Sequence, residues 1–166
     1  FMRVRKILLV VASIIKFFII LFLFIINSKA DENNIKYYSK DLGTLSLMYH
    51  RFNENKYPST NIQMNIFQKH IDIIESKNYE FENPKNFGLN FKKPKLKKKI
   101  LITIDDAFTS FYENAWPFLK KNKIPFLLFV STEPVGKRGY MTWEQIKEVE
   151  KESFAFIGNH SHSHEY

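Results

Sequence analysis

Two short segments of this sequence hold most of the side chains that could do chemistry. Asp105 and Asp106 end an apolar run, and His160, His162 and His164 alternate with serines close to the last residue. Adjacent carboxylates offer one group for a metal ion and one for proton transfer, and neutral imidazoles are common metal ligands. Together the two segments indicate half of a metal-dependent hydrolase site.

The aspartates follow a segment that is typical of a buried parallel strand. Residues 100–104 form a short apolar run rich in β-branched side chains. Successive side chains of a strand point to opposite faces, so Asp105 and Asp106 cannot both face one ion unless the backbone turns there. We therefore expect the two carboxylates to divide the work, one as a metal ligand and the other as a base.

The histidines need a different backbone. In an extended strand, His160 and His164 would lie about 13 Å apart, too far to share an ion at a Zn–N distance of about 2.1 Å. One helical turn would bring positions four apart onto one face. Residues 154–157 indicate a strand and Gly158-Asn159 its break. We therefore predict a helical turn from His160 to His164, with His162 pointing elsewhere and binding no metal.

These segments resemble the motifs of the polysaccharide deacetylase family, the NodB-homology or family 4 carbohydrate esterases. The family's first motif is Thr-Phe-Asp-Asp-Gly, here residues 103–107, and its second is His-Ser/Thr-x-x-His, here residues 160–164. The segment that joins them and an early Leu-Met-Tyr-His-Arg strand are also similar, so the resemblance covers roughly residues 44–164. Ala107 stands where the motif has glycine, which tolerates backbone angles that alanine resists.

The resemblance implies a fold, a site and an activity. The fold would be α/β, a partial (β/α) barrel preceded by an N-terminal hydrophobic helix. Asp105 would be the catalytic base, and Asp106, His160 and His164 would bind a divalent metal, zinc or else cobalt, nickel or iron. The reaction would be metal-dependent removal of acetyl groups from an amino-sugar polysaccharide.

The family's later motifs, which supply an arginine, an aspartate and a second catalytic histidine, would lie beyond Tyr166. We therefore expect an N-terminal portion of the domain, with little or no deacetylase activity from these 166 residues alone. Two alternatives stay open. One is an inactive fragment, and the other is a membrane-anchored protein that binds metal or glycan without releasing acetate.

The first thirty residues predict export. Residues 2–6 are basic, residues 7–26 are apolar except for Ser13 and Lys16, and residues 28–30 resemble a signal-peptidase site. We expect a periplasmic, extracellular or cell-surface protein. The alternatives are an uncleaved membrane anchor, since about 20 apolar residues suffice to span a bilayer, and a buried soluble helix. Residues 31–43 would be a linker, and residues 44–166 the truncated deacetylase domain.

Composition limits the other functions. The absence of cysteine excludes disulfides and thiolate metal sites. The net charge of +8 is concentrated in residues 92–99, which we interpret as a solvated loop, with a polyanion-binding patch as the alternative. No nucleic-acid-binding motif is recognised, and export makes nucleic acid an unexpected partner. The sequence does not specify an oligomeric state.

The domain alternates predicted strands and helices, which favours a parallel sheet. The strands are predicted at 45–49, 79–81, 100–104, 126–130 and 154–157, and the helices at 63–76, 111–121 and 143–151. Thr60 would cap the first helix, Thr142 with Gln145 would form a capping box for the last, and Pro84 with Gly88 indicate an irregular loop. His50, at a strand end, fits either a site or a structural role, and His70 is expected to face solvent.

Overall fold

The computed structural model describes residues 15–16, 43–90 and 98–165. The chain divides into two compact units, residues 1–40 and 41–166. In the first unit the described residues, Ile15 and Lys16, are helical. The predicted signal or anchor, nearly all of the predicted linker and most of the basic run at 92–99 lie outside the described residues. Within the described ranges, no helix has the length and apolar character needed to cross a bilayer.

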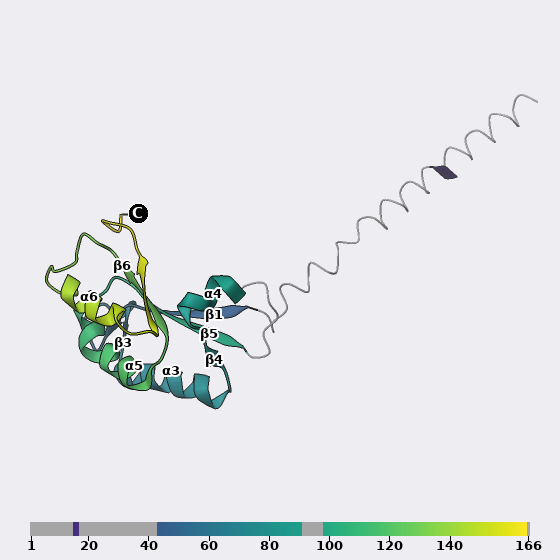
Figure 1. Ribbon diagram of the computed structural model, residues 1–166, viewed down its shortest axis with the longest axis horizontal. Helices are drawn as coiled ribbons and strands as arrows, with labels where there is room; N and C mark the ends of the chain where they lie inside the picture. The colour runs from purple at the N-terminus through teal and green to yellow at the C-terminus, as the bar shows by residue number, and fades with distance from the viewer. Residues whose placement is uncertain (1–14, 17–42, 91–97, 166) are drawn as a thin grey trace, which may run out of the picture. The chain divides into compact units, whose positions relative to one another are not determined.

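The second unit is built on a parallel sheet, which confirms the predicted α/β class. Its strands lie in the order β1 (Thr44–Tyr49), β5 (Lys99–Ile104), β6 (Phe126–Val130) and β7 (Ala155–Asn159), and β4 (Glu80–Phe81) also pairs with β5. Three helices, α3 (Met64–Ser76), α5 (Trp116–Asn122) and α6 (Trp143–Glu150), lie along one side of the sheet (Figure 1). The short strands β2 (Arg51–Phe52) and β3 (Asn61–Ile62) form a separate parallel pair.

Strand β5 is buried on both faces, as a central parallel strand should be. Ile100, Ile102 and Ile104 belong to the hydrophobic core that also contains buried residues of α3, α5 and α6. Side chains alternate along a strand, so Asp105 continues the opposite face. In an α/β sheet, ligands bind at the carboxyl ends of the parallel strands. The alternation along β5 therefore points Asp105 away from α3, α5 and α6, at the edge of the sheet where a site is expected.

Helix α3 begins and ends within a residue of the prediction because its apolar spacing is regular. Phe67, Ile71 and Ile74 are buried at intervals of four and three residues. The predicted cap was wrong: the N-cap is Gln63 without a side-chain hydrogen bond, rather than Thr60. The carboxamide oxygen Oδ1 of Asn53 instead accepts a hydrogen bond from the Met64 N–H, with 2.8 Å between N and O. A tertiary contact thus replaces the local cap.

Two other elements differ from the prediction. The helix expected at 111–121 is a π-helical turn, η2 (Phe111–Ala115), followed by α5. Pro117 lacks the N–H that would complete a regular α-helical hydrogen bond there, which accounts for the wider turn before it. The irregular loop expected around Pro84 and Gly88 is the helix α4 (Pro84–Asn90). The capping box of Thr142 and Gln145 is confirmed in both directions.

Gly158 has a packing role rather than the strand-breaking role that we predicted. Strand β7 continues through Gly158 to Asn159 and pairs with β6 over its whole length. A Cβ atom at position 158 would lie 2.8 Å from Cδ1 of Phe129 and 3.1 Å from Cδ1 of Leu127. Glycine is therefore needed because side chains of the neighbouring strand occupy the space over its Cα.

We expect Gly158→Ala to lower the free energy of unfolding by about 1–3 kcal/mol, since the added methyl overpacks the ring of Phe129. Urea unfolding followed by circular dichroism measures the change. A second substitution, Phe129→Leu, removes the ring atoms that the methyl would meet, so the double variant should be less destabilised than the sum of the single variants. Unchanged stability of the Gly158→Ala variant would contradict this packing.

Candidate metal and catalytic site

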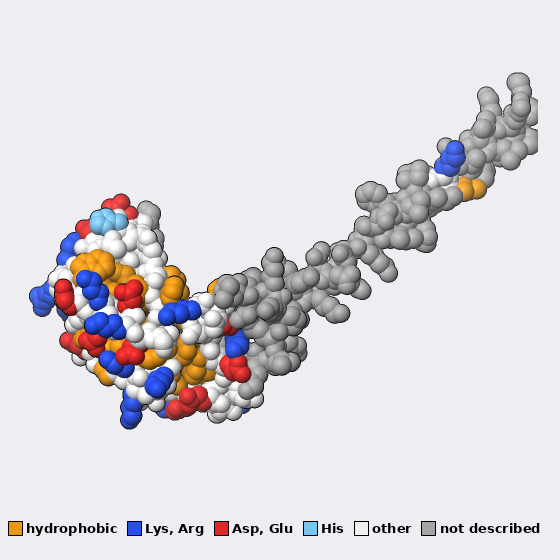
Figure 2. Space-filling model, in the orientation of Figure 1, with side chains coloured by type: hydrophobic (Ala, Val, Ile, Leu, Met, Phe, Trp, Pro, Cys, Tyr) orange, Lys and Arg blue, Asp and Glu red, His pale blue; other side chains and the backbone are white. Residues whose placement is uncertain are grey.

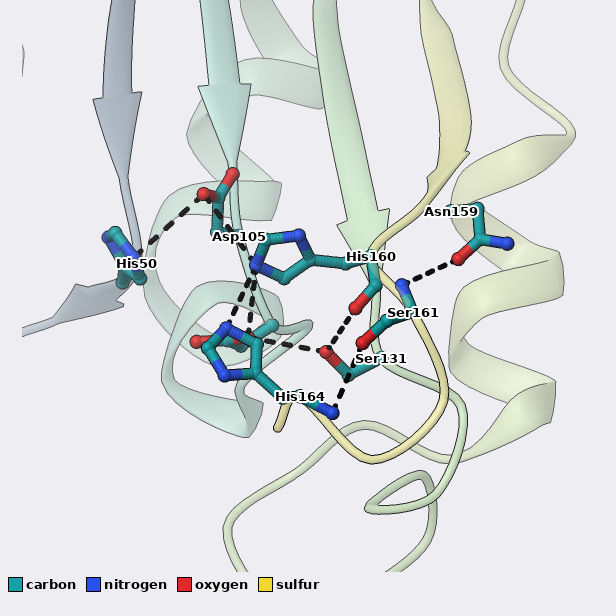
Figure 3. A network of polar contacts seen from close by, with 8 residues as sticks. His50, Asp105, Ser131, Asn159, His160, Ser161 and His164 are labelled. Atoms are coloured by element: carbon teal, nitrogen blue, oxygen red, sulfur yellow. Dashed lines mark hydrogen bonds and ion pairs between the residues drawn. The ribbon is translucent and has the colours of Figure 1, made fainter. Parts of the chain in front are cut away.

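The carboxyl ends of four strands bring together the side chains of the candidate site. His50 follows β1, Asp105 and Asp106 follow β5, Ser131 follows β6, and His160 follows β7. Figure 3 shows His50 on one side of Asp105 and the imidazoles of His160 and His164 on the other. Residues that are far apart in the sequence thus meet at one edge of the sheet, as expected for parallel strands.

The backbone turns at Asp106 and Ala107, so the alternation of side chains along β5 does not continue to the second aspartate. Asp106 has φ of 70° and Ala107 has φ of 51°, both in the left-handed region. Such a conformation costs a residue other than glycine about 1–2 kcal/mol. Ala107 is buried in the core, and burial of its methyl group returns about 0.8 kcal/mol. The turn expected of a glycine motif is therefore kept with alanine at this position.

The predicted helical turn from His160 to His164 was wrong. The segment is a loop in which Ser161 has φ of 69° and His164 has φ of 56°. Its short polar side chains close the turn: Asn159 Oδ1 accepts from the Ser161 N–H at 2.6 Å, and Ser161 Oγ accepts from the His164 N–H at 3.1 Å. This loop still brings the two imidazoles together, with their Nε2 atoms 3.1 Å apart.

Asp106, His160 and His164 form a cluster with the dimensions of a metal site. Oδ1 of Asp106 lies 3.6 Å from Nε2 of His160 and 3.5 Å from Nε2 of His164. Ligand atoms at about 2.0–2.1 Å from a tetrahedral zinc ion are about 3.3–3.4 Å from one another. The three atoms therefore fit around one ion, and their donor set of one carboxylate and two imidazoles suits zinc and the later first-row divalent metals.

His162 lies apart from this cluster. Its Nδ1 atom is 2.8 Å from Oγ1 of Thr132, and its side chain is exposed. The side chain of His162 thus points away from the other two imidazoles, as predicted. The backbone that places it there is a loop rather than the predicted helical turn.

Asp105 occupies a separate position between two histidines. Its Oδ2 atom lies 3.9 Å from Nε2 of His50 and 4.0 Å from Nε2 of His160. Its Oδ1 atom is buried and has no hydrogen-bond partner among the described residues. Burial raises the pKa of the Asp105 carboxyl, and the charges of His50 and His160 oppose part of that rise. A buried carboxylate with an unused oxygen is suited to accept a proton from a substrate or a water.

The sequence and structure comparisons point to one family. The model of the family described as "Polysaccharide deacetylase" matches residues 92–166. The Bacillus subtilis protein YxkH is also named a polysaccharide deacetylase. It is 31% identical over 121 residues, which cover 71% of this chain and 42% of YxkH. Residues 92–166 of the chain belong to the polysaccharide deacetylase family.

Other similar proteins also have deacetylase names. A poly-β-1,6-N-acetyl-D-glucosamine N-deacetylase of Staphylococcus aureus is 28% identical over a gapped alignment of 188 positions, which covers 97% of this chain and 63% of that protein. The solved structure of IcaB from Ammonifex degensii is 32% identical with a TM-score of 0.65, covering 71% of this chain and 52% of that one. The deacetylase PplD of Streptococcus pyogenes, at 23% identity and a TM-score of 0.63, shows the fold alone. The chain spans about half the length of the curated relatives it matches.

A cavity of about 490 Å³ reaches the site from the sheet face opposite α3, α5 and α6. Asp105 lines it together with mainly apolar side chains of β1, β5, β6, β7 and α4, among them Met48, Phe129 and Phe156. Asp105 is therefore accessible from this cavity as well as adjacent to the metal-type cluster.

The structure also places residues whose roles the sequence left open or missed. His50, left open, faces Asp105, whereas His70, expected to face solvent, is half-buried and its Nδ1 lies 3.0 Å from the Tyr49 hydroxyl. Ser131 was missed, although its position directly after a parallel strand was a usable signal.

The sequence analysis also missed Arg51. Its guanidinium carbon lies 4.4 Å from the ring centre of Tyr57 and 3.4 Å from the ring centre of Phe108, which follows Asp106 by two residues.

Proposed function

We propose that this chain carries the site of a metal-dependent deacetylase that acts on acetylated amino-sugar polysaccharide. The observation that carries the proposal is the cluster of Asp106, His160 and His164 beside the buried, incompletely bonded Asp105. The names of the Staphylococcus aureus relatives support poly-β-1,6-N-acetyl-D-glucosamine as the substrate class. Hydrolysis of its acetamido group would release acetate and leave a free amine on the polymer.

The metal would be held by Oδ1 of Asp106 and the Nε2 atoms of His160 and His164, the three atoms whose separations match one coordination sphere. A bound divalent metal supplies Lewis acidity toward the acetyl carbonyl and toward water. Three protein ligands would leave a position for water or substrate, as in catalytic rather than structural zinc sites.

Asp105 is proposed as the general base. Its carboxylate does not belong to the three-residue cluster, yet Oδ2 is 4.0 Å from the His160 imidazole, so a water between cluster and carboxylate would be within reach. Asp105 takes one proton from that water while the oxygen atom of the water forms a bond to the acetyl carbon. Burial favours this role because it raises the pKa of the carboxyl, which makes the carboxylate a stronger proton acceptor than an exposed aspartate.

His50 is proposed as the general acid. It lies on the other side of Asp105 from the cluster, with Nε2 3.9 Å from Oδ2, and it is not one of the three candidate ligands. A protonated His50 can give its proton to the leaving nitrogen when the C–N bond breaks, which balances the proton taken by Asp105. The expectation of little activity rested on a histidine beyond Tyr166. His50 offers the chain another proton donor.

Acetate release tests the proposed function. The purified chain with one equivalent of zinc, cobalt or nickel is incubated with a β-1,6-linked N-acetylglucosamine oligomer, and acetate is measured enzymatically. We expect slow release that requires metal and stops on adding a chelator. A folded, metal-loaded chain that binds the oligomer and releases no acetate would contradict the proposal and leave the two alternatives, an inactive fragment and a metal- or glycan-binding protein.

His50→Gln should lower the rate of acetate release by about 10²-fold, because glutamine keeps a polar side chain of similar reach but cannot donate a proton as a general acid. Metal content should be unchanged, since His50 is outside the cluster. His70→Gln is the matched control: it changes a histidine that contacts Tyr49 rather than Asp105. Equal losses in both variants would show that His50 acts on folding rather than on the reaction.

We propose that the protein is exported through its first thirty residues. If residues 28–30 are read by signal peptidase, the mature chain should begin at Asp31 and lack the apolar segment. N-terminal sequencing of the protein recovered from the cell surface or medium decides this. A membrane-bound chain that keeps residues 7–26 would favour the anchor instead.

A further inference from the structure

Ser131 lies between Asp106 and His160, two of the three residues of the candidate metal cluster. It follows β6 directly and is 1% exposed. Its hydroxyl donates a hydrogen bond to the main-chain carbonyl oxygen of His160 at 3.0 Å, and its Oγ atom is also 3.5 Å from Oδ1 of Asp106 (Figure 3). One buried side chain thus touches both the aspartate motif and the histidine motif.

The backbone around Ser131 fixes this arrangement. The hydrogen-bonding pattern between β6 and β7 continues past the strand ends: the His160 N–H donates to Val130 O at 3.0 Å, and the Thr132 N–H donates to Ser161 O at 3.2 Å. Ser131 lies between these two backbone contacts. The two contacts fix the backbone on either side of Ser131 and hold the loop that carries His160 at the end of β6.

We propose that Ser131 is a positioning residue of the metal site, which holds His160 and the Asp106 carboxylate at the separation that one ion requires. This inference rests on the proposed function, because it assumes that Asp106, His160 and His164 bind the metal. Groups that orient metal ligands from outside the coordination sphere typically change metal affinity by about 10–100-fold when removed. Loss of the hydroxyl would free the His160 carbonyl and leave Asp106 Oδ1 without this neighbour.

Thr132 provides a matched comparison. It is the next residue, it also has a hydroxyl, and that hydroxyl contacts His162 at 2.8 Å instead of the cluster. Ser131→Ala and Thr132→Val each remove one hydroxyl from the same loop. Ser131→Thr keeps the hydroxyl at the cluster at the cost of an added methyl group.

The test measures zinc affinity by competition with a chromophoric chelator, and the stability of the metal-free chain by urea unfolding. We expect the zinc dissociation constant to rise about 10-fold or more in Ser131→Ala, to change little in Thr132→Val, and to recover at least in part in Ser131→Thr. Equal affinity in Ser131→Ala and the parent chain would overturn the role of Ser131 while leaving the proposed function standing. A parent chain that binds no zinc would overturn both.

A purely structural role gives a different pattern. In that case Ser131→Ala would lower the free energy of unfolding of the metal-free chain while the refolded variant kept the parent affinity for zinc. That result would also overturn the proposal.

Discussion

Replacing Asp106 by alanine is expected to weaken zinc binding on the order of 10³-fold, because it removes the one anionic ligand of three from a site whose full binding energy is large. His160→Ala should have an effect of the same order. His162→Ala is the matched control, since its imidazole contacts Thr132 and lies outside the cluster. Elemental analysis of the dialysed proteins and chelator competition measure the change.

The parent chain and the His162→Ala variant should each retain about one ion per molecule, while the Asp106→Ala and His160→Ala variants retain almost none. Loss of metal from His162→Ala equal to that from His160→Ala would mean that the loop after β7 presents a different pair of imidazoles. The separations found for His160 and His164 would then not describe the metal-bound chain.

Asp105→Asn is expected to reduce the rate of acetate release by about 10²–10⁴-fold without loss of the metal. Asparagine fits the same space but cannot accept the proton that the reaction requires. The metal-free variant should be at least as stable as the parent, because the substitution removes a carboxylate whose ionisation burial disfavours. Acetate release, metal content and urea unfolding are measured on the same preparations.

Activity of the Asp105→Asn variant equal to that of the parent would exclude Asp105 as the base. Loss of metal together with activity would instead mean that Asp105 is a ligand, and that the division of work between the two aspartates is wrong.

The elements that the sequence predicted best are those with strong periodic patterns. The apolar runs of β5 and β6 and the amphipathic spacing of α3 depend on local side-chain burial, so their positions could be predicted within a residue or two. The capping box of α6 is also local. The cap of α3 could not be predicted, because Asn53 reaches it from a different part of the chain.

The candidate site was predictable in its residues and less so in its backbone. The strand rule put the two aspartates on opposite faces unless the backbone turned between them, and the positive φ angles of Asp106 and Ala107 show that it does turn. The spacing of His160 and His164 equally fits a helical turn and a loop closed by Ser161 and Asn159, and only side-chain hydrogen bonds distinguish the two. The contacts of His50 and Ser131 arise from the order of strands in the sheet, which a single sequence does not specify.

A crystal structure of the chain grown with zinc, with anomalous data collected on both sides of the zinc absorption edge, tests the central claim most directly. The account predicts one strong anomalous peak about 2.0–2.2 Å from Oδ1 of Asp106 and from the Nε2 atoms of His160 and His164, with the Asp105 carboxylate outside the coordination sphere. A peak bound by Asp105 or His162, or no peak in a crystal that contains zinc, would contradict it.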